Sequence, residues 1–334
     1  MAQQLCQHSG LLFGVGIAIS GYFPGSELMA LGEGRRDALF ALPAGLLGAA
    51  SWTISYQTAA GHWLVTHANY GSILITGRTI EASSRINLFL TALPWVLVLL
   101  LIALLVPRFP RSKHVCLIAH IKGGHDEGNP VLKAKREDAV AYLLEGSIAK
   151  RGGRAEKFAY ALSSEPNTYS AVLVLVAMLM GTTVVLGITL HQILGESTTY
   201  SWLAAVLFLP GYEYSKTVLA GVGWEPFSDI GTFMGAFFSA VLISKRFTAF
   251  RKVMPPSWRN RFGNEQWKRA LGVFAGSYLM LFGARMAGGC ASGHILCGVI
   301  QMAASGTCFG IVVIIGAVLT ARVVYGSASE KVSP

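Results

Sequence analysis

Charged residues are scarce in this sequence. Asp, Glu, Lys and Arg make up 13% of its 334 residues, about half the share usual in soluble domains, whereas 53% are hydrophobic. The mean hydropathy is +0.51. This apolar content excludes a soluble domain, a disordered chain and a collagen-like repeat. We therefore expect an integral membrane protein whose main surroundings are a lipid bilayer.

Cysteines and enzyme fingerprints are also few. The five cysteines form no CxxC pair and no Cys/His set with zinc spacing: Cys6, Cys116, Cys290, Cys297 and Cys308. A disulfide framework and a structural metal site are therefore not expected. No P-loop, GxSxG, HExxH or Rossmann fingerprint occurs in the sequence context that it requires. We therefore expect no enzyme and no cofactor.

Acidic residues are outnumbered by basic ones, 17 against 27, which gives a net charge of +10. The basic residues gather in two stretches between apolar segments, 108–157 and 245–269. The positive-inside rule predicts that both face the cytoplasm. Residues 137–144 and 148–160 fit either short amphipathic surface helices or a solvated loop. The sequence has no basic stripe with interleaved aromatics, so we expect no nucleic-acid partner.

A membrane-crossing helix needs about 20 mostly apolar residues. Four segments satisfy this clearly: 87–106, 169–190, 227–244 and 270–286. Four others are short, glycine-rich or carry a proline: 11–22, 38–56, 202–210 and 306–325. Because an even number of crossings must separate two cytoplasmic loops, we expect either that 202–210 is re-entrant or that the first basic stretch is only partly a cytoplasmic loop. Residues 11–22 resemble a signal peptide only superficially, since they lack a basic n-region and a small-residue cleavage site.

One layout occurs twice, about 268 residues apart. Residues 21–28 read GYFPGSEL and residues 289–296 read GCASGHIL. In each copy an apolar run meets a Gly-x-x-x-Gly turn, followed by about ten residues and a further apolar segment that starts at Ala38 or Gly306. This repeat predicts two related halves, each with a short broken helix.

A helix that breaks within the membrane needs partners for its free amides, which only protein or a water-lined cavity provides. Those amides and the positive end of the following half-helix attract anions, and paired breaks in transporters mark substrate sites near the midplane. We therefore predict a small anion as substrate. The candidate contacts are Pro24, Gly25, Ser26, Gly288, Gly289, Cys290, Ser292, Gly293 and His294.

Structural roles compete with each of these interpretations. The glycine spacing also suits close helix packing in lipid, and Cys290 alone fits a small buried hydrophobe. His294 fits an interior histidine with satisfied nitrogens as well as a ligand. Arg285 fits three roles: steering an anion, snorkelling to the interface, or pairing with an acid.

Residues 282–294, FGARMAGGCASGH, resemble the C-terminal signature of the YeeE/YedE family of bacterial membrane proteins, the sulfur-transport or thiosulfate-uptake family. Residues 255–269, with WRNRFG, and residues 21–48 are similar to other parts of that family. The resemblance implies an all-α polytopic membrane protein of two inverted, pseudo-symmetric halves with short re-entrant helices, in the bacterial inner membrane. Residues 1–106 and 169–334 would form the halves, and 107–168 the basic loop between them.

The resemblance also implies that thiosulfate passes a constriction by contacting cysteine thiols. By position, Cys290 matches a family relay cysteine, and Cys297 is a second candidate. Tyr22 and Phe23 stand where the first half of the family typically has cysteine. Two alternatives remain: an accessory protein that docks a cytoplasmic sulfur carrier on its basic loops, and a diverged relative that does not transport. A redox pair of Cys290 and Cys297 is disfavoured, because seven helical residues separate them by about 10 Å.

Overall fold

The computed structural model describes residues 3–67, 93–98, 171–190, 194–243 and 252–326, with isolated positions at 101, 130, 133–134, 192, 247 and 249–250. Helices are the only regular secondary structure in these ranges. Most of the predicted span 87–106, nearly all of the basic loop 108–157, and both predicted surface helices, 137–144 and 148–160, lie outside the described residues.

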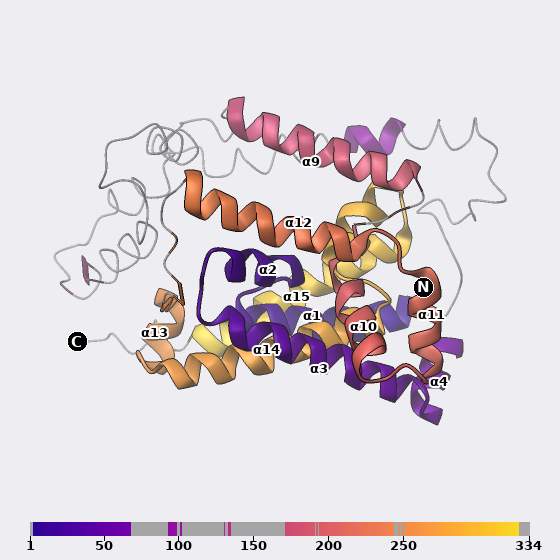
Figure 1. Ribbon diagram of the computed structural model, residues 1–334, viewed down its shortest axis with the longest axis horizontal. Coiled ribbons are helices and arrows are strands. Elements are labelled where there is room, and N and C mark those ends of the chain that lie inside the picture. Colours follow the sequence, from indigo (N-terminus) through magenta and orange to yellow (C-terminus); the bar gives the residue numbers. More distant parts are fainter. Residues whose placement is uncertain are drawn as a thin grey trace.

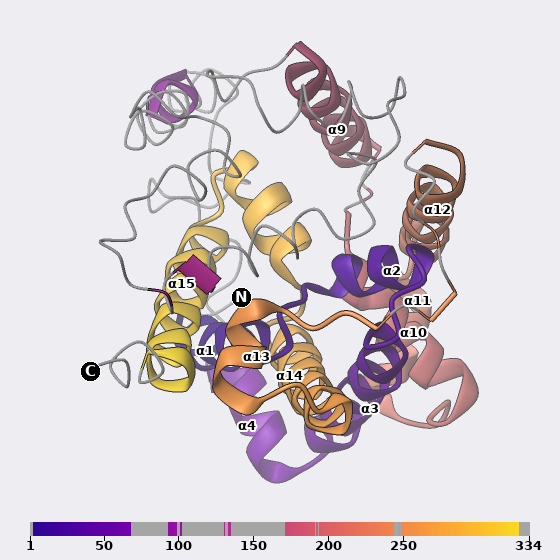
Figure 2. The same ribbon diagram turned by 90° about the vertical axis from the view of Figure 1, so that its left-hand side faces the viewer.

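Four long helices form the core: α1 (Gln3–Ser20), α3 (Ala38–Tyr56), α14 (Gln266–Met286) and α15 (Ala304–Tyr325). Figures 1 and 2 show α1 between α15 and α14, with α3 on the other side of α14. Glycines permit this close packing, because a methyl group on Gly16 of α1 would overlap the main chain of Gly276 and Met280 in α14. The best-buried side chains of this core are Phe13, Met280, Leu281 and Phe309.

Three described segments are long and apolar enough to cross a membrane: His8–Gly32, Ala38–Tyr56 and Ala304–Tyr325. The first of these segments is interrupted at residues 21–23, after α1, in agreement with the short segment expected at 11–22. The other two are continuous helices, and α3 continues through Pro43, which lies inside it. The glycines that suggested irregularity serve helix packing instead.

The predicted repeat of layout is confirmed at the level of element order. The first copy runs from α1 through a break to α2 (Pro24–Gly32) and then to α3; the second runs from α14 through a break to the π-helix η4 (Ser292–Gly298) and then to α15. The inverted symmetry of the two copies stays a prediction. Both short helices lie beside the long-helix core, so both breaks are supported by protein rather than exposed to lipid.

The remaining helices join and flank these copies: α4 (Ala59–His67), α9 (Ala171–Thr189), α10 (Glu196–Leu207), α11 (Glu213–Gly221), α12 (Glu225–Phe238), the π-helix η3 (Ser239–Ile243) and α13 (Pro256–Phe262). Helix α12 lies along α2 (Figure 1). The 12 residues of α10 rise about 18 Å, too short to cross a hydrocarbon core of about 30 Å. The re-entrant path predicted around 202–210 remains a prediction.

Large apolar side chains cover the outside of several helices. Ile314 is 63% exposed on α15, Phe227 is 75% exposed on α12, and Met178 is 65% exposed on α9. A water-soluble surface rarely carries so much contiguous apolar area, whereas a lipid-facing surface requires it.

Candidate functional site

Both helical breaks begin with a glycine in the left-handed region. Gly21, at φ +75°, follows α1, and Gly288, at φ +79°, follows α14. At α14 the Gly288 amide donates to the Arg285 carbonyl at 3.0 Å and the Gly289 amide to the Ala284 carbonyl at 2.9 Å. This is the Schellman pattern, which favours glycine at that position because a Cβ is strained there. Gly288 therefore ends α14 and redirects the chain toward Cys290.

The N-terminus of α2 is set by Phe23, Pro24 and Ser26. Pro24 occupies the first helical turn, where its missing N–H is not needed. The Ser26 hydroxyl accepts a hydrogen bond from the Phe23 amide at 2.7 Å and lies 2.9 Å from the Phe23 carbonyl. Ser26, a predicted substrate contact, thus caps the helix in this structure.

The two breaks meet through Glu196, the first residue of α10. Its Oε2 accepts a hydrogen bond from the Gly25 amide at 3.1 Å, and its carboxylate lies near the Ser292 side chain. Ser292 Oγ in turn lies 2.9 Å from the fully buried Cys290 Sγ. We call Gly25, Glu196, Cys290 and Ser292 the junction. It connects the predicted motif of the first copy with that of the second.

The junction is an oxyanion site already occupied by the protein's own carboxylate. A methyl group on Gly25 would overlap the Glu196 carboxylate, so only glycine leaves room for it there. The amides at the N-terminus of α2 carry partial positive charge, which stabilises a carboxylate as it would a substrate oxyanion. The anion held by the Gly25 amide in this structure is therefore the Glu196 carboxylate.

His294 has one ring nitrogen bonded to the main chain, as expected of an interior histidine. Its Nε2 lies 3.0 Å from the Ala287 carbonyl and, because a carbonyl only accepts, donates to it. The imidazole centroid lies 4.8 Å from that of Phe309, and a methyl group on Gly289 would come within 3.3 Å of the ring. His294 thus closes the loop that holds Cys290. Gly293 is less constrained than Gly289, since a methyl group on Gly293 would meet nothing within 4 Å.

Arg285 is buried, with 5% of its surface exposed, so it does not snorkel. Its Nε and Nη2 donate to the Tyr214 hydroxyl at 3.0 and 2.6 Å. Its Nη1 donates to the hydroxyls of Ser197 and Thr198, the two residues that follow Glu196. No described carboxylate lies within salt-bridge distance of it, so pairing with an acid is also not observed. A buried cation held only by neutral groups is energetically costly and attracts an anion.

Tyr22 and Phe23 lie away from the junction's polar groups. The Tyr22 ring is buried beneath the guanidinium groups of Arg35 and Arg269, at 5.1 and 5.8 Å. Phe23 is 44% exposed and its ring centroid lies 6.3 Å from that of Phe13. Both residues support the fold around the first break.

Cys290, Cys297 and Cys308 are free thiols. Cys297 is buried on η4 and lies near Cys290 and the main chain of Leu194, two residues before Glu196. It therefore borders the junction. Cys308 lies on α15 and is only partly buried.

Sequence analysis missed two carboxylates at this site, Glu196 and Glu27. Glu27 is completely buried on α2, one turn after Pro24, and its Oε2 accepts a hydrogen bond from the Tyr200 hydroxyl of α10 at 3.0 Å. A second link thus ties α2 to α10. Glu27 is followed by an apolar run, a signal that could have identified it, because an ionisable group at membrane depth is costly without a function or partner. Glu196 is followed by Ser197, Thr198 and Thr199, so the sequence carries no comparable signal for it.

Comparison with protein families agrees with this geometry. Residues 8–319 match the family model described as Sulphur transport. A search of curated proteins gave no match. The match covers both breaks, all four junction residues and the apolar helices that make this an integral membrane protein. The chain therefore belongs to the Sulphur transport family, the YeeE/YedE family that its C-terminal motif resembles.

Proposed function

We propose that this protein carries thiosulfate across the bacterial inner membrane, past a constriction formed at the junction, without changing it chemically. The observation that supports the proposal best is the series of contacts from Gly25 through Glu196 to Ser292 and Cys290. It brings an oxyanion site and a thiol together at the two helical breaks. Thiosulfate has both matching parts, charged oxygens and a soft terminal sulfur.

Each group has a separate role in the proposed passage. The Cys290 thiol is a weak donor and polarisable, so it suits the terminal sulfur of thiosulfate. The Gly25 amide and the Ser292 hydroxyl would donate to the oxygens, and the Arg285 guanidinium would offset the negative charge. Cys297, buried beside this group, would receive the terminal sulfur next.

Glu196 would act as an internal competitor for the substrate. Its carboxylate now accepts the Gly25 hydrogen bond that a thiosulfate oxygen would need. Two anions at one amide repel each other, so substrate binding requires the Glu196 carboxylate to move aside or to take up a proton. Between turnovers the carboxylate would return and close the site.

The test is uptake of labelled thiosulfate into cells that lack their own sulfur-anion importers. Cys290→Ala is compared with wild type and with Cys308→Ala, a matched change of a cysteine outside the junction, at equal membrane abundance. We expect wild type and Cys308→Ala to take up thiosulfate, and Cys290→Ala to fall to the level of cells without the protein.

Two results would count against the proposal. Uptake that survives Cys290→Ala would remove the thiol from the path. No uptake by any variant, from protein that is folded and inserted, would instead favour an accessory that docks a sulfur carrier, or a relative that does not transport.

A further inference from the structure

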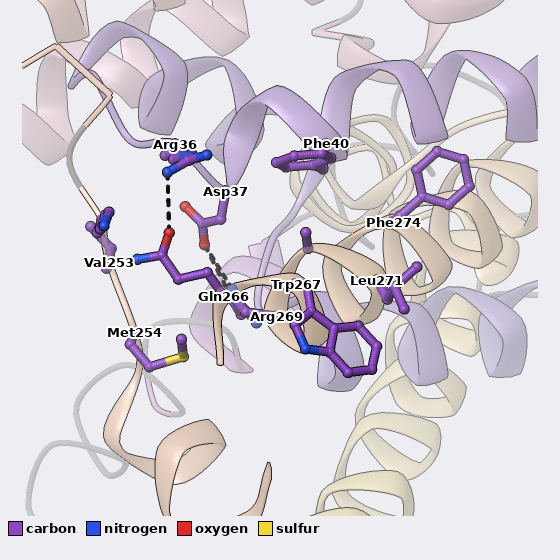
Figure 3. Close-up of a pocket in the computed structure, with 12 residues that line it drawn as sticks. Arg36, Asp37, Phe40, Val253, Met254, Gln266, Trp267, Arg269, Leu271 and Phe274 are labelled. Atoms are coloured by element: carbon purple, nitrogen blue, oxygen red, sulfur yellow. Dashed lines mark hydrogen bonds and ion pairs between the residues drawn. The ribbon is translucent and has the colours of Figure 1, made fainter. Parts of the chain in front are cut away.

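A cavity lies at the end of the core, where α3 and α14 begin. It has a volume of about 590 Å³, within the range of small-molecule sites. Its walls come from the start of α3, the first half of α14 and the segment that precedes α13 (Figure 3). Junction residues do not line it, so the proposed thiosulfate path does not account for it.

One wall of this cavity is polar and positively charged. Three cations line it, Arg36, Lys252 and Arg269, against a single carboxylate, Asp37, which leaves two positive charges in excess. Asp37 forms a buried ion pair with Arg269, with an Nη2–Oδ2 distance of 3.0 Å, and also pairs with Arg35 at 3.4 Å. Exposed Arg36 donates to the Gln266 side chain at 3.3 Å, and exposed Lys252 forms no ion pair with a described residue. Arg36 and Lys252 are therefore the charges available to a ligand.

The other wall is apolar and continues along α3 and α14. Phe40 lies on α3, and Trp267, Leu271 and Phe274 lie on α14 (Figure 3). Phe40 is 41% exposed, Trp267 60% and Leu271 59%, so these side chains face outward. A tryptophan with such exposure at a helix end is typical of the membrane–water interface. The cavity thus has a cationic rim at the interface and an apolar wall that leads into the bilayer.

We propose that this cavity binds an anionic phospholipid. The phosphate would lie between Arg36 and Lys252, and the acyl chains would follow Phe40, Leu271 and Phe274. A soluble anion would use only the rim and a zwitterionic lipid mainly the apolar wall, whereas an anionic lipid matches both. Basic pockets between helices at membrane interfaces recognise lipid headgroups in this way. The inference is independent of what the protein transports.

Lipid in this cavity would reinforce the buried ion pair behind it. Arg269 Nη2 also donates to the Ser20 carbonyl at 2.8 Å, so Arg269 joins the end of α1 to α14 and, through Asp37, to the start of α3. A ligand that contacts Arg36 and α14 holds the starts of α3 and α14 together around this ion pair. Bound lipid should therefore raise the thermal stability of the purified protein.

The experiment measures lipid binding to delipidated, detergent-purified full-length protein by native mass spectrometry and by the shift in melting temperature. The probes are phosphatidylglycerol, phosphatidylcholine with the same acyl chains, glycerophosphoglycerol, inorganic phosphate and poly-glutamate. The Arg36→Gln/Lys252→Gln variant is compared with Lys216→Gln/Arg261→Gln, which removes two exposed cations outside the cavity. Melting without lipid verifies that each variant is folded.

Wild type and the control should bind phosphatidylglycerol more tightly than phosphatidylcholine by about thirtyfold, and the Arg36/Lys252 variant should lose that preference, as expected for about 1 kcal/mol per cation. Phe40→Asn should weaken both lipids and leave the preference intact. Equal binding of the two lipids by wild type would overturn the proposal. So would binding of inorganic phosphate or glycerophosphoglycerol as tight as that of the lipid, which would assign the site to a soluble anion. Binding of poly-glutamate without phosphatidylglycerol would assign it to an acidic protein partner instead.

Discussion

The Glu196 carboxylate accepts a hydrogen bond from the Gly25 amide at 3.1 Å, across 171 positions of sequence. Glu196 begins α10, a helix that belongs to neither copy of the repeated layout, and it also lies near the Ser292 side chain of the second copy. The Glu196 side chain therefore connects the two breaks, and a substitution of Glu196 should affect both of them.

Replacement of Gly25 by alanine should reduce thiosulfate uptake with little loss of stability. The added methyl group takes the place of the Glu196 carboxylate, which can swing away because it ends a flexible side chain. The methyl group then prevents a thiosulfate oxygen from accepting a hydrogen bond from the Gly25 amide. The loss of this hydrogen bond should lower uptake about tenfold. Uptake of labelled thiosulfate and the melting temperature in detergent are measured together.

Gly231→Ala on α12 is the matched control, because a methyl group there meets nothing within 4 Å. It should leave uptake unchanged and stabilise the helix by up to about 1 kcal/mol. Wild-type uptake by Gly25→Ala would contradict the proposed use of this amide.

Glu196→Gln should lower the KM for thiosulfate. The neutral amide keeps the shape of the side chain but competes less for the Gly25 N–H and does not repel the substrate. Because hydrogen bonds with an ionised partner are about twice as strong as neutral ones, we expect a decrease of about threefold to tenfold. Initial uptake rates over a range of thiosulfate concentrations measure it, with Glu213→Gln, an exposed acid on α11, as control. A raised KM would mean that Glu196 supports the substrate site rather than competing for it.

Arg285→Met should abolish uptake while leaving the melting temperature equal to or above that of wild type. The substitution removes a buried cation that has no described acidic partner, and with it a desolvation penalty. It also removes the charge proposed to offset the substrate. Arg285→Lys should retain part of the uptake, and Arg261→Met, at an exposed position on α13, all of it. If Arg285→Met transports normally, the buried charge serves the fold alone.

Sequence patterns predicted the element order around each break, because glycine and proline act locally. Gly21 and Gly288 need the left-handed region and Pro24 suits a first helical turn, so the breaks could be located without a structure. The judgement of which segments cross was less successful. Local composition could not distinguish glycines that interrupt a helix from those, such as Gly16 and Gly276, that let two helices approach.

The candidate site was predicted in part, for a related reason. Cys290 and Gly25 were identified from motifs, and the structure links them through Ser292 and Glu196. Glu196 itself lies in a short helix outside both motifs, so its role depends on a contact between distant segments. Such contacts follow from packing, which a single sequence does not display.

Asp37→Asn should destabilise the protein at neutral pH and have a decreasing effect in acid. Burial alone would raise the pKa of Asp37, but the guanidinium charges of Arg35 and Arg269 outweigh it and hold the pKa below its ordinary value. A depressed carboxyl pKa contributes stability that is present above the unfolded pKa of about 3.9 and is lost as the pH falls through the folded value. Breaking this buried pair should cost about 3 kcal/mol at pH 7.

The measurement is the free energy of unfolding in detergent between pH 7 and pH 3. The control, Glu265→Gln, makes the same change of charge in the exposed pair of Glu265 and Lys268, which are 53% and 39% exposed. Exposed pairs contribute about 1 kcal/mol or less, so the control should differ little from wild type at any pH. The gap between wild type and Asp37→Asn should instead narrow below about pH 4, because both chains then approach a neutral side chain beside Arg269. A gap that stays constant down to pH 3 would mean that Asp37 acts through shape or hydrogen bonding and not through its charge.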